Sequence, residues 1–262
     1  MKRCFFGFKI FAPWPKLPKN SRVLTEENRH VTLAFLGDVS SKQIEELHQV
    51  PLPAFCFGPV GTFDRVIFLP KKSPRLVAWN IRWQDAKMLN DFLKRLQHWL
   101  KKHDFMIQNR KMLWHVTMCR NHFKTKEWQQ NFFSLPFIVD SFNLYESLKD
   151  SNYQILWSHN FLKPFEETEH TADLAFSIRG KNFTELYYNA QLALAFNNPA
   201  FLPFCVLEDK KKKNIEDVVI GLNELIFEMD KKIGSPFKAV SFHKNIKSFK
   251  DNLLEWEMIV DV

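Results

Sequence analysis

The stretches RHVTLAFLG (residues 29–37) and WHVTMCR (residues 114–120) both contain His-Val-Thr followed by an apolar residue. Each lies in a run rich in apolar and β-branched residues, and such runs predict β-strands. The side chains of a strand alternate between its two faces, so residues two positions apart share a face. Each stretch therefore predicts a strand with a histidine and a threonine on one face and apolar residues on the other.

The repeated pattern gives two histidines, His30 and His115, and two threonines, Thr32 and Thr117. A neutral imidazole can accept a proton from an attacking oxygen while a protonated one gives a proton to a leaving oxygen, because the ordinary histidine pKa lies near neutrality. Threonine hydroxyls can hydrogen-bond the phosphate oxygens. Metal-independent phosphodiester chemistry is one interpretation. Two ordinary half-exposed surface pairs are an equal alternative from spacing alone. Zinc is disfavoured, because no third ligand stands at a useful spacing.

Length and composition limit the class of protein. The chain has 262 residues, which suits one large or two small domains, and its 45% hydrophobic content can form a core. We find no glycine-rich nucleotide-binding loop. The four cysteines are isolated, as in a reduced cytoplasmic protein. No apolar stretch reaches the roughly 18 residues of a membrane span, so we expect no membrane partner.

Charge and composition predict two domains, residues 1–163 and 164–262, separated at the acidic seam KPFEETEH (163–170). Counting Lys, Arg, Asp and Glu, the first carries a net +12 and the second a net −4. The basic part suits a polyanionic ligand and the acidic part does not.

Local patterns predict both strands and helices in each domain. Helices are expected over 84–103, where apolar residues recur at helical spacing, after Ser40 or Ser41, over 183–196 and over 218–229. Strands are expected at 5–11, 30–37, 64–70, 76–83, 113–120, 137–147, 153–162, 172–180, 237–243 and 254–262. The expected fold class is α+β.

Residues 1–163 resemble the LigT-like two-histidine phosphoesterases, the RNA 2',3'-cyclic phosphodiesterase family. Besides the two motifs, the runs ENRHVTLAFLGDVSSKQIEEL, VGTFDRVIFLPKKSPRLVAWNI and VDSFNLYESLKDSNYQILWSHNF carry the resemblance. It implies a bilobal fold with pseudo-twofold symmetry, in which each lobe supplies one motif to a central cleft. The sequence departs from the family where a Pro-rich segment (12–22) stands in place of a helix.

The resemblance also implies roles for five residues. His30 would be the proton donor to the leaving 3'-oxygen and His115 the proton acceptor that activates water, while Thr32, Thr117 and Arg120 would bind the substrate. The implied reaction needs no cofactor and opens an RNA 2',3'-cyclic phosphate to a 2'-phosphomonoester. The family also leaves open a 2'-5' RNA ligase activity.

Residues 164–262 resemble archease, an accessory protein of RtcB-type RNA ligases. The runs EHTADLAFSIRGKNFTELYYNAQLAL and GLNELIFEMD carry the resemblance, although the stretch after Gly234 is trimmed. It implies a small α/β domain that binds metal through Asp173, Asp261 and Val262, and their oxygens suit Ca²⁺.

Together the two resemblances indicate a cytoplasmic RNA end-processing protein. Its expected partners are RNA with 2',3'-cyclic phosphate ends and an RtcB-type ligase, in tRNA splicing or RNA repair. Two alternatives stay open: a non-catalytic protein that binds RNA ends and docks a ligase, and a phosphodiesterase for small cyclic phosphates.

Overall fold

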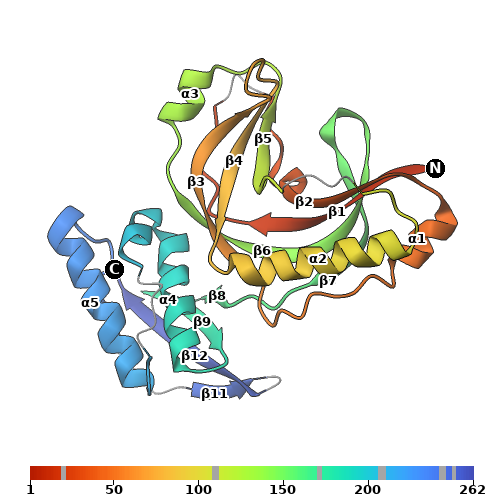
Figure 1. The fold of residues 1–262 in the computed structure, drawn as a ribbon. Helices are drawn as coiled ribbons and strands as arrows, with labels where there is room; N and C mark the ends of the chain where they lie inside the picture. Colours follow the sequence, from red (N-terminus) through yellow and green to blue (C-terminus); the bar gives the residue numbers. More distant parts are fainter. Residues whose placement is uncertain (19–21, 108–111, 170–172, 206–210, 242–245, 250–251) are drawn as a thin grey trace. The chain divides into compact units, whose positions relative to one another are not determined.

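The computed structural model describes residues 1–18, 22–107, 112–169, 173–205, 211–241, 246–249 and 252–262. The chain is an α+β protein that divides into two compact units, Met1–Leu162 and Lys163–Val262 (Figure 1). The break after Leu162 lies one residue before the boundary predicted from charge and composition. Each unit is described below by itself.

The first unit is built on one antiparallel sheet of seven strands. Along it the strands run β2-β1-β6-β3-β4-β5, and β7 pairs with β6 on the side that β3 also uses. The strands are β1 (Lys2–Phe11), β2 (His30–Val39), β3 (Val60–Leu69), β4 (Leu76–Trp83), β5 (His115–Arg120), β6 (Leu135–Ser147) and β7 (Tyr153–Asn160).

The two end strands of this sheet, β2 and β5, contact each other although four strands separate them in the pairing order. The sheet is therefore strongly curled, as Figure 1 shows. Residues 22–24 bridge the two ends. The amide of Leu24 donates to the carbonyl of Met118 at 2.9 Å, and the amide of Arg120 donates to the carbonyl of Arg22 at 3.1 Å. This segment leads into β2, so it ties the approach to one histidine motif to the end of the strand that carries the other.

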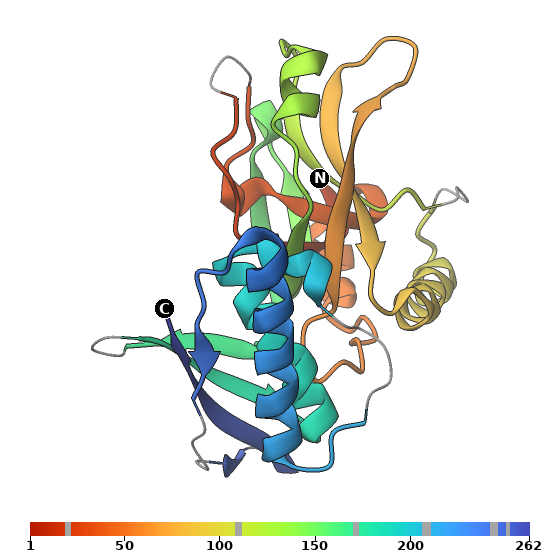
Figure 2. The same cartoon turned by 90° about the vertical axis from the view of Figure 1, so that its left-hand side faces the viewer.

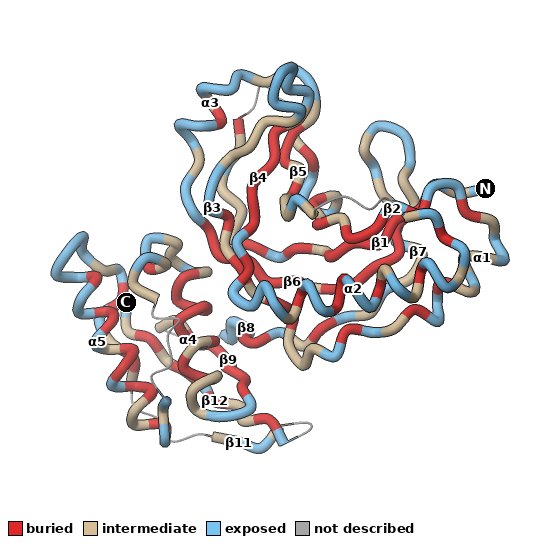
Figure 3. The backbone as a smooth tube through the Cα atoms, viewed as in Figure 1, coloured by how far each residue is buried: buried red, intermediate tan, exposed pale blue. Residues whose placement is uncertain are grey.

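Helix α2 (Ala86–Lys102) covers one face of the sheet with the apolar stripe that its periodicity predicts. Its Phe92 ring lies 5.9 Å from Phe8 of β1 and 5.4 Å from Phe142 of β6, centroid to centroid. Asp85 caps its N-terminus by accepting from the amide of Met88. Figure 3 shows that buried residues follow the sheet and the inner side of this helix. The core of the first unit thus lies between this helix and the sheet.

Two short helices complete the first unit. Helix α1 (Ser41–Leu47) begins with a capping box, in which Ser40 and Gln43 satisfy each other's backbone amides. Helix α3 (Thr125–Gln130) buries Trp128. The Pro-rich segment after β1 packs Trp14 against Phe63 and Trp79, at 5.4 and 5.9 Å between ring centroids. An aromatic side chain thus anchors the segment that departs from the family pattern.

The second unit pairs a five-stranded antiparallel sheet with two helices. Its strands run β10-β12-β9-β8, with β11 paired to β12. Figure 2 shows both helices over one face of this sheet. The elements are β8 (Phe165–Thr168), β9 (Leu174–Gly180), α4 (Phe183–Asn197), α5 (Ile215–Ile233), β10 (Ala239–Val240), β11 (Ile246–Phe249) and β12 (Leu253–Asp261).

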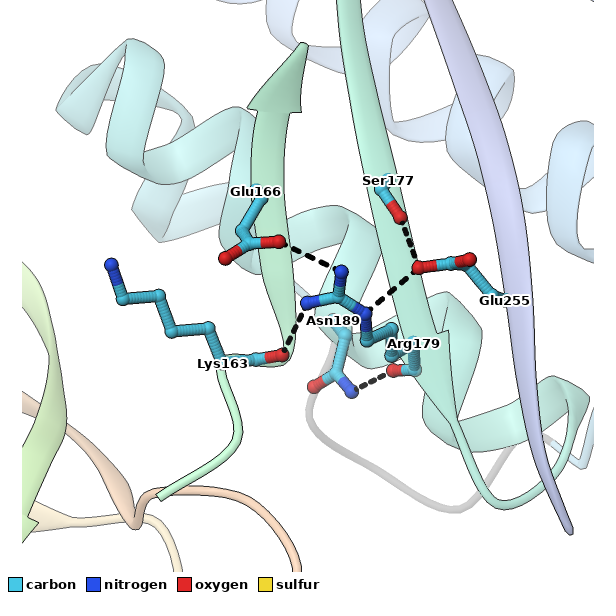
Figure 4. A network of polar contacts seen from close by, with 6 residues as sticks. All are labelled: Lys163, Glu166, Ser177, Arg179, Asn189 and Glu255. Atoms are coloured by element: carbon cyan, nitrogen blue, oxygen red, sulfur yellow. Dashed lines mark hydrogen bonds and ion pairs between the residues drawn. The ribbon is translucent and has the colours of Figure 1, made fainter. Parts of the chain in front are cut away.

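The sheet of the second unit carries a polar network centred on Arg179 (Figure 4). The guanidinium donates to Glu166 at 2.7 Å, to Glu255 at 2.9 Å and to the carbonyl of Lys163 at 3.4 Å. Ser177 donates to the same Glu255 carboxylate at 2.7 Å. One buried cation thereby ties strands β8, β9 and β12 together.

Several elements differ from the sequence prediction. Strands β8 and β11 and helix α3 were not anticipated, because each is short and the acidic FEET of β8 has no apolar alternation. The strand expected over 237–243 is only Ala239–Val240 within the described residues, and residues 242–243 lie outside them. The remaining predicted strands and helices are confirmed to within four residues at either end.

Candidate active site

The two histidine motifs occupy equivalent places, at the start of the two end strands β2 and β5. In β2, His30 and Thr32 are half-buried while Val31 and Leu33 are buried. In β5 the same alternation holds for His115 and Thr117 against Val116 and Met118. The face assignments predicted from the strand period are confirmed. The contact between β2 and β5 brings the two motifs to one place in the first unit.

Both histidine rings are held by the same kind of hydrogen bond. The Nδ1 of His30 lies 2.8 Å from the carbonyl oxygen of Asn28, and the Nδ1 of His115 lies 2.7 Å from that of Leu113. A carbonyl oxygen can only accept, so Nδ1 carries the proton in each ring. The Nε2 atoms are therefore the ones that exchange a proton with a ligand.

Aromatic rings enclose His30. Its ring centroid lies 4.8 Å from that of Phe5, 5.3 Å from that of Tyr145 and 4.6 Å from that of Tyr153, which meets it edge-on. Burial among these rings lowers the pKa of His30 to about 4, and the positive charges of Arg120 and His115 act in the same direction. The hydrogen bond to Asn28 opposes this lowering of the pKa. His30 is thus neutral at pH 7 in the free protein.

Arg120 ends strand β5 and acts on both histidines. Burial lowers the pKa of His115, the bond to Leu113 opposes this, and the charge of Arg120 lowers it further. Arg120 also lowers the pKa of His30, so its guanidinium is near both rings. Its Nε is buried and has no hydrogen-bond partner in the part of the chain that the structure describes. A guanidinium with an unused donor beside two imidazoles suits an anionic phosphate.

The threonines complete the arrangement. Thr32 is paired with Gly7 across the β1–β2 ladder, and Thr117 with Ala78 across the β4–β5 ladder. Both cross-strand neighbours are small, and at Gly7 even a Cβ would lie 2.9 Å from the carbonyl oxygen of Val31 and 3.3 Å from the Tyr145 ring. Among the described residues, neither hydroxyl has a hydrogen-bond partner in the protein. They are therefore available to a ligand, as the two Nε2 atoms and Arg120 are.

The acids predicted to bind metal lie in the second unit, on two adjacent strands. Strand β12 pairs with β9 so that Val260 faces Leu174, which places Asp261 and Asp173 at neighbouring strand ends. The first three residues of the H-T-A-D run (170–173) lie outside the described residues.

Two of the predicted metal ligands already have partners in the protein. Ser241 donates to Asp261 at 3.4 Å, and Lys238 donates to the oxygen of Val262 at 2.5 Å. The oxygens suit a hard cation, but a cation on Val262 would have to displace the Lys238 ammonium. Within the described residues no three His, Cys, Asp or Glu side chains gather as a metal site.

Some residues at the site carry no clear signal in the sequence. Asn28 stands two positions before His30. Its role could have been predicted only if a histidine at the start of a strand were known to hydrogen-bond the backbone carbonyl two residues earlier. Phe5, Tyr145 and Tyr153 come from three other strands, and their meeting around His30 depends on tertiary register.

Comparison with known proteins gives distant similarities. No protein-family model matches the chain. The chain is 27% identical over 154 residues to an RNA 2',3'-cyclic phosphodiesterase of Thermotoga maritima, covering 53% of this chain and 78% of that protein. Among solved structures, E. coli LigT complexed with 3'-AMP is 21% identical, with a TM-score of 0.45, over 62% of this chain and 99% of LigT. A protein of Thermus thermophilus, TT0787, is 14% identical, also with a TM-score of 0.45, over 61% of this chain and 97% of that one.

The chain is distantly similar to the LigT-like phosphoesterases. The similarity covers a little more than half of the chain, and no comparison identifies the rest as archease. In the described residues, no helix combines the length and apolar character needed to cross a membrane.

Proposed function

We propose that the first unit hydrolyses RNA 2',3'-cyclic phosphate to a 2'-phosphomonoester. The observation that carries this proposal is the matched pair of histidines, each with its Nδ1 proton bound to a carbonyl and both under the charge of Arg120. An ordinary surface pair of histidine and threonine would need neither the fixed Nδ1 proton nor a nearby arginine. The distant similarity to an RNA 2',3'-cyclic phosphodiesterase supports the same reaction.

In this mechanism His115 is the base and His30 the acid. The Nε2 of His115 takes a proton from water, and the water oxygen forms a bond to phosphorus. The bond between phosphorus and the 3'-oxygen breaks, and the Nε2 of protonated His30 gives its proton to that oxygen. Arg120, Thr32 and Thr117 hold the non-bridging oxygens as negative charge moves onto them. The products are a 2'-phosphate and a 3'-hydroxyl.

The protonation of His30 depends on the substrate. Its pKa of about 4 leaves it neutral in the free protein at pH 7. A bound phosphate places a negative charge beside the ring and raises that pKa, so the substrate itself prepares the acid. Arg120 offsets part of this effect, because its charge acts in the opposite direction on both histidines.

The substrate class follows from charge. Residues 1–163 carry a net +12, which favours a polyanionic strand over a single nucleotide. Two other functions use the same site: hydrolysis of small cyclic phosphates, and binding of RNA ends without turnover.

One assay separates these functions. A short RNA ending in a 2',3'-cyclic phosphate and adenosine 2',3'-cyclic phosphate are each incubated with the full chain, and phosphomonoester formation is followed. We expect hydrolysis of both, with the higher kcat/KM on the RNA. His30→Ala and His115→Ala should each lower the rate by about 10²–10⁴-fold. His98→Ala, an exposed histidine of α2, is the matched control and should keep the wild-type rate.

The outcomes distinguish the candidates. Equal kcat/KM on the two substrates favours the small-molecule enzyme, and RNA binding without any product favours the binding protein. Near-full activity in either histidine variant contradicts the proposed roles.

For the second unit we propose a cation site at Asp173 and Asp261 that supports an RtcB-type ligase, as the archease resemblance implies. The pairing of β9 with β12 supports it, because it sets these two acids at adjacent strand ends. Calorimetry with Ca²⁺ and guanylylation of a cognate ligase are the measurements. We expect Asp173→Ala and Asp261→Ala to abolish Ca²⁺ binding and ligase stimulation, and Glu257→Ala, an exposed acid of β12, to keep both. Wild-type protein that neither binds Ca²⁺ nor stimulates the ligase contradicts this proposal.

A further inference from the structure

We propose that Asn28 is a positioning residue that sets the tautomer and orientation of His30. The inference rests on the proposed function, because it assigns a role within the same site. Asn28 does not reach the reacting atoms itself. It acts through its own backbone carbonyl, which accepts the Nδ1 proton of His30 at 2.8 Å.

The side chain of Asn28 is tied to three groups. Its Oδ1 accepts from the backbone amide of Tyr153 at 3.1 Å, and its Nδ2 donates to Thr25 Oγ1 at 3.0 Å and to Asn152 Oδ1 at 3.5 Å. A backbone amide can only donate, so the oxygen of the side chain must face Tyr153 and the orientation of the amide is fixed. Asn28 thereby fastens the turn before β2 to the hairpin between β6 and β7.

These hydrogen bonds of Asn28 bear on two contacts of the His30 ring, one with a hydrogen-bond acceptor and one with an aromatic ring. The peptide of Asn28 supplies the hydrogen-bond acceptor, and the residue that Asn28 holds, Tyr153, supplies the aromatic edge 4.6 Å from the ring centroid. Loss of the amide would free the Asn28 carbonyl to turn away and would loosen Tyr153. His30 could then carry its proton on Nε2, and a neutral ring in that form can no longer accept a proton there.

The second histidine lacks a polar side chain behind its acceptor. The carbonyl that holds His115 belongs to Leu113, whose side chain is 44% exposed and has no polar group. Both histidines thus donate from Nδ1 to a backbone carbonyl. Only the carbonyl that binds His30 belongs to a residue whose own side chain is hydrogen-bonded to its surroundings. The extra support falls on the histidine that lies in the aromatic enclosure, where a ring without its Nδ1 acceptor would be left buried with an unpaired donor.

The test uses the full chain with Asn28→Ala and Asn28→Asp. The aspartate keeps the acceptor for the Tyr153 amide and cannot donate to Thr25 or Asn152. Ring ¹⁵N shifts, measured by NMR at pH 7, report the tautomer of each histidine without any substrate. Steady-state hydrolysis of an RNA 2',3'-cyclic phosphate and its pH profile report the effect on turnover. Asn131→Ala, an exposed asparagine of the α3 C-terminus with a comparable local bond, is the matched control.

We expect wild-type His30 and His115 both to carry the proton on Nδ1. In Asn28→Ala, His30 alone should shift toward the Nε2–H form, kcat should fall by about 10–100-fold with little change in KM, and the acid limb of the pH profile should move. Asn28→Asp should lie between that variant and the wild type, and Asn131→Ala should match the wild type.

Two results are kept apart by this design. An unchanged His30 tautomer in Asn28→Ala overturns the inference whether or not the protein is an enzyme, because the NMR measurement needs no turnover. A wild-type protein that hydrolyses no cyclic phosphate overturns the proposed function, while the NMR measurement still decides the positioning role. A rate loss in Asn28→Ala with both tautomers and the pH profile unchanged also overturns the inference, because a merely structural effect would look like this.

Discussion

At the scale of single residues, the proposed chemistry depends on two imidazoles whose environment is unfavourable to positive charge. Burial and Arg120 lower the pKa of both, and for His30 the value falls to about 4. The ordinary histidine value of 6.5 therefore does not describe either group in the free protein. In the proposed mechanism a bound phosphate raises both pKa values, so substrate binding and protonation of the site are linked.

This linkage predicts an acidic optimum for kcat/KM. That ratio reports the free protein, in which one histidine must be neutral and the other protonated. Because both pKa values lie below 6.5, the optimum should also lie below pH 6.5. The kcat profile should lie at higher pH, since bound phosphate raises both pKa values. Arg120→Gln removes a charge that lowers both pKa values and should move the kcat/KM optimum upward. An optimum of kcat/KM above pH 7 in the wild type would contradict these assignments.

At the scale of elements, the site exists because the two end strands of one sheet curl until they meet. The strand period in the sequence was enough to predict which residues share a face, and α2 was evident from its apolar spacing. The meeting of β2 with β5 was expected only from the family resemblance and not from local patterns, because it depends on the pairing order of four intervening strands and on the bridge by residues 22–24. Short elements such as β8 and α3 were missed since few residues carry too little pattern.

Strand β8 illustrates how a short, acidic element is held by one cation. Arg179, whose side chain is 10% exposed, bonds carboxylates from β8 and from β12. Burial raises the pKa of Glu255, but the bonds from Ser177 and Arg179 outweigh it, so the pKa lies below the ordinary 4.5. The stability that this pairing gives is present above pH 4.5 and is lost as the pH falls through the lowered value.

Removing the cation should loosen this part of the second unit. Arg179→Met leaves Glu255 without its charged partner, and we expect a loss of about 1–3 kcal/mol in the stability of the sheet. Hydrogen exchange of the amides in β8, β9 and β12 measures it, with faster exchange expected in the variant at pH 7. Lys181→Met, an exposed lysine nearby in sequence, is the control. Unchanged exchange in Arg179→Met would show that packing alone holds β8.

At the scale of the whole molecule, the charge difference and the division into two units agree. The acidic seam marked the boundary to within one residue, because a change of composition is a property of the sequence alone. The placement of His and Thr on one face of each strand was likewise predictable from the repeated motif. The partners of His30, the lowered pKa values and the support from Asn28 were not, since each depends on residues that are distant in sequence or on a backbone carbonyl.

The charge difference predicts where RNA binds. Affinity for RNA should fall steeply with salt, as phosphate contacts release counterions. Lys71→Gln with Lys72→Gln, on the exposed turn between β3 and β4, should weaken binding and reduce the salt slope. Lys211→Gln with Lys213→Gln, in the second unit, makes the same change in charge and should leave the RNA affinity and its salt dependence unchanged. Filter binding at several salt concentrations measures this, and the opposite ranking would place the RNA on the second unit.

In the proposed reaction two histidines open a cyclic phosphate without metal. The most direct measurement follows an RNA ending in a 2',3'-cyclic phosphate by ³¹P NMR, in H₂¹⁸O with EDTA present. We expect conversion to a 2'-phosphomonoester that contains one ¹⁸O, with the rate unchanged by EDTA and nearly lost in both His30→Ala and His115→Ala. A product with a 3'-phosphate, a reaction abolished by EDTA, or a histidine variant with near-wild-type rate would contradict it.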